Sequence, residues 1–117
     1  MNIQDPTLVI VRGINQEWIA ENFTEMWIGF GGSPVGVPVQ DAKYVGLYLG
    51  APVSKITHIG IVDRIEPDNG GKSYYLKVII KLDKENQVDP GHAIRKHEYW
   101  HLKDFGLSEL ALLYKTL

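Results

Sequence analysis

The string HEYWH at residues 97–101 has the residue types and spacing of the zinc metalloprotease motif H-E-x-x-H. On a helix, two histidines four residues apart share a face and can hold one Zn²⁺, while the glutamate acts as general base. Two features oppose this interpretation. Arg95 and Lys96 place positive charge beside the string, and the extended motif would need glycine and histidine where this chain has Asp104 and Leu107. We expect a chance match, with a small zinc-dependent hydrolase as the alternative.

Aromatic side chains beside a glycine-rich stretch offer a second kind of chemistry. Trp27 and Phe30 lie next to the glycines of residues 29–36, which lack the lysine and the strand–glycine–helix order of a phosphate-binding loop. Rings next to a segment that allows close backbone approach are what stacking on a nucleobase requires. Core packing is the alternative role for each ring.

Composition limits the other classes of function. The chain has 117 residues, 44% hydrophobic and 22% charged, which predicts one globular domain over residues 1–117. The absence of cysteine excludes disulfides, thiolate metal sites and a cysteine nucleophile. The net charge of -2 argues against strong non-specific binding to nucleic acid. Residues 1–6 lack the basic cluster of a signal peptide and no apolar run could span a bilayer, so we expect a cytoplasmic protein without a membrane partner.

Hydrophobic patterning predicts a small sheet with helices at both ends. The expected strands cover residues 8–11, 43–49, 56–65 and 73–82, and the last of these alternates apolar and polar side chains. The turn residues at 68–71 predict that the last two strands form an antiparallel hairpin. Helices are expected over 16–26, 96–105 and after Ser108, and the fold class is therefore α+β, a small, curled, mostly antiparallel β-barrel with flanking helices.

Two parts of the chain resemble the PUA-like superfamily, which includes the PUA, EVE, ASCH and YTH domains. The segments KYVGLY (43–48), PV (52–53) and ITHIGIV (56–62) resemble its strand–turn–strand signature. Gly91, Arg95, Tyr99 and Leu102 resemble the end of that domain in bacterial and archaeal members linked to restriction or RNA processing. The resemblance implies a PUA-like β-barrel that binds nucleic acid, in some relatives by inserting a modified base into an aromatic pocket.

The resemblance also implies a set of base- and phosphate-binding positions. They are Trp27 and Tyr48 for stacking, Thr57 and His58 for base edges, and Arg95 and Lys96 for phosphate. A flipped base is recognised by such stacking and hydrogen bonding. We expect a binding module for DNA or RNA, with no catalytic residue, metal or cofactor. Besides the hydrolase, the other alternative is a protein-interaction subunit of a larger defence or processing complex.

Overall fold

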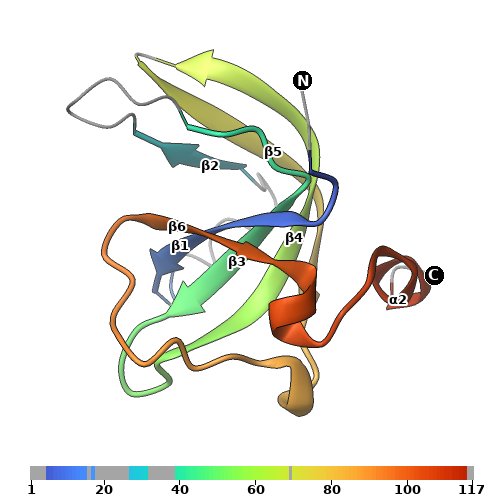
Figure 1. The fold of residues 1–117 in the computed structure, drawn as a ribbon. Helices are drawn as coiled ribbons and strands as arrows, with labels where there is room; N and C mark the ends of the chain where they lie inside the picture. The colour runs from blue at the N-terminus through green and yellow to red at the C-terminus, as the bar shows by residue number, and fades with distance from the viewer. Residues whose placement is uncertain (1–4, 16, 18–26, 32–38, 69, 116–117) are drawn as a thin grey trace.

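The protein folds into a curled six-stranded mixed sheet that forms a half-barrel (Figure 1). The computed structural model describes residues 5–15, 17, 27–31, 39–68 and 70–115. The strands are β1 (Leu8–Ile14), β2 (Trp27–Phe30), β3 (Tyr44–Leu49), β4 (Lys55–Asp68), β5 (Gly71–Lys81) and β6 (His97–His101). Two 3₁₀ helices, η1 (Lys84–Asn86) and η2 (Leu102–Phe105), and one α-helix, α2 (Glu109–Lys115), complete the described part of the chain.

The strand order is β2-β5-β4-β3-β1-β6, so the sequence neighbours β1 and β2 lie at different places in the sheet. Four of the five neighbouring pairs are antiparallel, and β1 pairs with β3 in parallel. The long connection between β1 and β3, which includes β2, is what permits a parallel pair. The expectation of a curled, mostly antiparallel sheet is confirmed, although the sheet is mixed and forms a half-barrel.

The β4–β5 hairpin has the antiparallel pairing that the sequence predicts. Its register runs from His58 opposite Lys81 to Asp68 opposite Gly71. Gly70 adopts a φ of 85°, a left-handed conformation that glycine enters without steric cost. Register shifts around Val62 mark irregular pairing, which bends a sheet and increases its twist. The hairpin can therefore curl far enough to carry β2 toward the opposite edge.

The expected helix over residues 96–105 is wrong. Residues 97–101 form β6, which pairs along β1 from Leu8 opposite His101 to Arg12 opposite His97, and η2 follows directly. The free edge of β1 offers backbone partners that outweigh a weak local preference for helix. The helix after Ser108 is confirmed as α2, whereas the expected helix over 16–26 lies outside the described residues except for Glu17. No helix in the described ranges is long and apolar enough to cross a membrane.

The core lies on both faces of the sheet because successive strand residues alternate between them. Val9 and Val11 of β1 belong to the outer face, which η2 and α2 cover with Phe105 and Leu112. Ile10 belongs to the inner face, which contains residues of the two edge strands β2 and β6. The rings of Phe30 on β2 and His97 on β6 are 5.9 Å apart, so the sheet's two edges meet across the half-barrel.

Two tyrosines inside the curl hold the segment that leads into β3. The buried Tyr74 hydroxyl donates to the Gln40 carbonyl and accepts from the Ala42 amide at 3.0 Å. The Tyr99 hydroxyl accepts from the Gln40 amide at 2.9 Å. Burial raises the pKa of Tyr74, so its hydroxyl stays protonated and keeps its donor role.

Candidate functional site

A pocket of about 330 Å³ lies between the end of β1 and the beginning of β2. Its lining comes from residues 12–15 on one side and residues 27–29 on the other. The Trp27 side chain is 40% exposed at this pocket, and its ring centroid is 6.5 Å from that of Tyr75 on β5. The volume is at the low end of the range for small-molecule pockets. The pocket is therefore suited to one flat ring lying against the indole.

Arg12 supplies a fixed positive charge at this pocket. Arg12 comes directly after the apolar residues 8–11 of β1 and lies on the inner face with residues 8 and 10. Its Nη1 donates to the Gly29 carbonyl of β2. Its guanidinium carbon also lies 5.9 Å from the centroid of the Phe30 ring. These contacts link β1 to the edge strand β2 and hold the cation where it lines the pocket. Asn15 adds an amide to the same wall.

The exposed Arg95 and Lys96 lie on the loop that passes beside this pocket. The carbonyl oxygen of Ile94 approaches Gly13 so closely that a Cβ added there would lie 2.5 Å from it. Gly13 is itself a lining residue, so the loop and the pocket wall are in direct contact. Within the described ranges, neither Arg95 nor Lys96 forms an ion pair with a carboxylate. Both cations can therefore accept an external anion.

Two histidines lie in the same row of the sheet as Arg12, His97 directly beside it and His58 beyond the apolar Leu47. In register, Arg12 lies opposite His97 on one side and Leu47 on the other, and Leu47 lies opposite His58. Burial and the Arg12 charge lower the pKa of His97. Burial and the Lys81 charge lower the pKa of His58. Both imidazoles are therefore neutral at pH 7 and can act as hydrogen-bond donors or acceptors without adding charge.

Three of the residues expected to bind a base are in the interior. Tyr48 is 5% exposed, and it lies opposite Gly13 in the sheet with its ring in the outer core. Thr57 and His58 are 4% and 9% exposed on β4, joined by a 2.7 Å contact between Thr57 Oγ1 and His58 Nδ1. The pocket beside Trp27 is lined by none of these three residues. Tyr48 has no free ring face for stacking and instead packs beneath the pocket wall.

Of the six residues expected to bind a base or phosphate, only Trp27 lines the pocket. Arg95 and Lys96 follow Ile94, whose carbonyl oxygen approaches the pocket wall at Gly13. Sequence reasoning missed Arg12 and Asn15, which line the pocket. The alternation of β1 carries a signal for Arg12, because residues 8, 10 and 12 of a strand share a face. No comparable signal identifies Asn15, because its residue type and its place before the helix expected over 16–26 are typical of an N-cap.

The HEYWH string does not have the geometry of a zinc site. On a strand, His97 and His101 share a face but are about 13 Å apart, whereas zinc–nitrogen bonds are about 2 Å long. His101 instead contacts Asp5, with 3.1 Å between Nε2 and Oδ2. Glu98 pairs with His92 at 2.6 Å, and this interaction raises the pKa of His92. The described residues contain no group of three or more potential metal ligands. The structural basis for the hydrolase alternative, two histidines on one helical face, is therefore absent.

Comparisons with known proteins add no relative to this picture. No protein-family model matches the chain, and searches of curated proteins and of solved structures return no match. Function is therefore inferred from the pocket, its charges and the sequence.

Proposed function

We propose that this domain is a non-enzymatic module that binds DNA or RNA at one unpaired or flipped base. The exposed Trp27 ring beside the 330 Å³ pocket is the observation that carries the proposal. A base entering the pocket stacks on the indole, and Arg12 and Asn15 provide polar groups for its edge. Stacking on an aromatic side chain is worth about 1–3 kcal/mol per base.

Arg95 and Lys96 bind the phosphates that flank this base. They lie on the loop in contact with the pocket wall at Gly13, and neither is neutralised by a carboxylate in the described ranges. The net charge of -2 keeps general attraction to the nucleic-acid backbone weak. The stacked base therefore supplies a large share of the binding free energy, which favours single-stranded or locally opened substrates.

Membership of the PUA-like superfamily is part of this proposal. The curled, mostly β half-barrel supports it, together with the resemblance at residues 43–62. The superfamily relation extends the proposal to a modified base as the ligand and to a cytoplasmic role in restriction, defence or RNA processing.

Binding of short fluorescent oligonucleotides at several salt concentrations tests the phosphate part of the proposal. The panel includes single strands and duplexes, each with modified and unmodified bases. Arg95→Gln and Lys96→Gln are each expected to reduce the salt slope by about 0.7 for a single strand. Lys84→Gln changes an exposed lysine on η1 and should leave the slope unchanged. Absence of binding at low salt, or equal slopes for all the variants, contradicts the proposal.

A further inference from the structure

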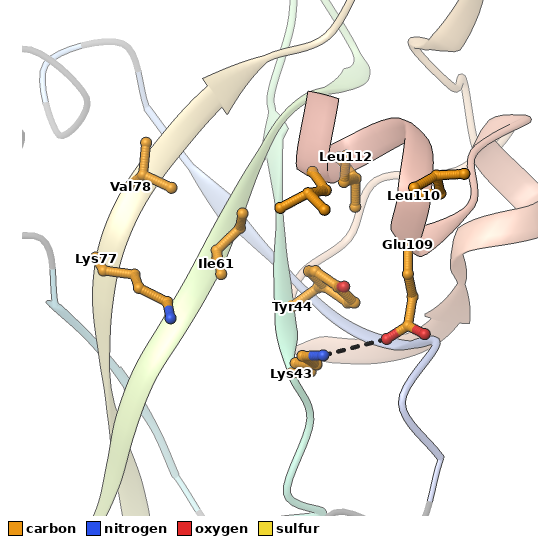
Figure 2. A pocket seen from close by; sticks show the side chains of 9 residues that line it. Lys43, Tyr44, Ile61, Lys77, Val78, Glu109, Leu110 and Leu112 are labelled. Carbon is orange, nitrogen blue, oxygen red and sulfur yellow. Dashed lines mark hydrogen bonds and ion pairs between the residues drawn. The ribbon is translucent and has the colours of Figure 1, made fainter. Parts of the chain in front are cut away.

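A second hollow lies on the outer side of the sheet, between α2 and the β4–β5 hairpin. It has a volume of about 650 Å³, and Figure 2 shows the side chains that line it. Ile61 and Val78 line it from the hairpin, and Leu110 and Leu113 line it from α2. The groove is thus mainly apolar and separate from the pocket at Trp27, with which it shares no lining residue.

The helix beside this groove leaves most of its apolar side chains in water. Within α2 only Leu112 is buried, whereas Leu110, Leu113 and Tyr114 are 60%, 55% and 68% exposed. These three positions are spaced i, i+3 and i+4, so they form one stripe along the helix. A helix of seven residues depends on tertiary packing for its stability. A partner that covers the stripe would therefore complete the burial of this element.

Charges at the edges of the groove restrict the kind of partner. Glu109 on α2 binds Lys43 at 3.2 Å, as the dashed line in Figure 2 shows. Lys77 on the hairpin side has no carboxylate partner in the described ranges. A suitable occupant thus combines a narrow apolar ridge with an acidic group that can face Lys77. The α2 helix itself has this combination, because Glu109 lies directly before the exposed stripe and its side chain is still 42% exposed while it binds Lys43.

We propose that two copies of this chain associate through the groove, with α2 of each copy lying in the groove of the other. A two-fold axis makes such an interface self-complementary, because the same patch supplies both ridge and groove. Leu110 and Leu113 then pack against Ile61 and Val78 of the partner subunit, and Lys77 faces the partner's Glu109. A specific dimer covers roughly a tenth of a small protein's surface per copy, and the whole accessible surface of this chain is 6900 Å².

Sedimentation velocity without nucleic acid, over a wide range of loading concentrations, tests this interface. The wild-type chain is expected to shift from monomer to dimer as concentration rises. Leu113→Glu buries an unpaired charge in the interface and should keep the chain monomeric at concentrations where wild type is dimeric. Ala93→Glu is the control, because it makes an equal charge change at an exposed residue before β6. Thermal melts should show all three proteins folded, because Leu113 is already 55% exposed.

Charge reversal supplies an independent arm that does not depend on altering the helix stripe. Lys77→Glu places like charges opposite each other, and Glu109→Lys does the same in the opposite sense, so each variant alone should be monomeric. Their mixture should form heterodimers, since both charge pairs are then attractive. One pair is native, and in the other the positive and negative side chains have exchanged places. A wild-type chain that stays monomeric throughout, dimerisation that survives Leu113→Glu, or a mixture that stays monomeric overturns the proposal. None of these results depends on nucleic-acid binding by the Trp27 pocket.

Discussion

Gly13→Ala should damage both the fold and the binding site, because the backbone of the loop before β6 occupies the space of the new methyl group. An added Cβ would lie 2.5 Å from the Ile94 carbonyl oxygen, a separation that real Cβ atoms essentially never show. Because that neighbour is backbone, no side-chain rotation can relieve the contact, and the loop or β1 must move. Overpacking of this kind costs about 1–3 kcal/mol of unfolding free energy.

Thermal and urea denaturation of Gly13→Ala measure this cost directly. For a domain of this size, 1 kcal/mol corresponds to about 4 °C in Tm, so a decrease of about 4–12 °C is expected. Gly50→Ala is the matched control: Gly50 follows β3, and a Cβ there meets no atom within 4 Å. Its φ is not in the left-handed region, so the control should be neutral or more stable by up to about 1 kcal/mol.

Displacement of the loop should also move Arg95 and Lys96 away from the pocket wall. We expect Gly13→Ala to weaken oligonucleotide binding at temperatures where the variant is fully folded, and Gly50→Ala to leave it unchanged. If Gly13→Ala matches the control in both Tm and binding, the close approach of the loop to β1 is refuted. The grouping of the cations with Trp27 then fails as well.

The remaining predictions concern buried polar groups. Tyr74→Phe leaves the buried Ala42 amide and the part-buried Gln40 carbonyl without their partner and should lower the unfolding free energy by about 1–3 kcal/mol. The exposed Tyr114→Phe should stay within about 0.5 kcal/mol, and urea denaturation measures both. The pKa values of His58 and His97 are lowered in the folded chain, so below about pH 6.5 the unfolded chain binds more protons than the folded chain. Tm should therefore fall between pH 7 and pH 5, because the raised pKa of His92 acts in the opposite direction only at an exposed, solvent-screened site. His97→Gln should reduce that fall. Zinc should not raise Tm, because His97 and His101 are too far apart to share one ion. A saturable increase in Tm with zinc that His97→Ala abolishes would contradict the strand assignment.

The sequence predicts the hairpin well because its signals are local. The alternation of residues 73–82 and the turn glycine at position 70 are sufficient to define β4, β5 and their pairing. The signals that end η2 and begin α2 are equally local. Gly106 ends η2 with a φ of 67°, and Ser108 Oγ accepts from the Ala111 amide at the beginning of α2.

Non-local pairing explains the errors. The spacing of the HEYWH string fits a helix, and nothing within residues 96–105 reveals that β1 has a free edge to which this segment adds. The four residues of β2 are too short to show a period, and they become a strand by pairing with β5 from Trp27 opposite Tyr75.

The candidate site also has residues whose exposure the sequence predicts and residues whose burial depends on non-local pairing. The exposure of Arg95 and Lys96 follows from their charged side chains, whereas the place of Trp27 at the edge of the sheet depends on the pairing of β2 with β5. The burial of Tyr48 and His58 depends on which strands lie on either side of β3 and β4, and the pattern of a single strand cannot supply that information.

Fluorescence of an oligonucleotide with 2-aminopurine at one unpaired position tests the central claim most directly. Stacking on Trp27 should quench the probe on binding, and Trp27→Ala should abolish the quenching and weaken binding roughly tenfold to a hundredfold. Trp27 lies on an edge strand and is 40% exposed, so the variant should remain folded, as circular dichroism can verify. Binding of equal affinity by Trp27→Ala, with the probe still quenched, would show that the base lies elsewhere and contradict the account.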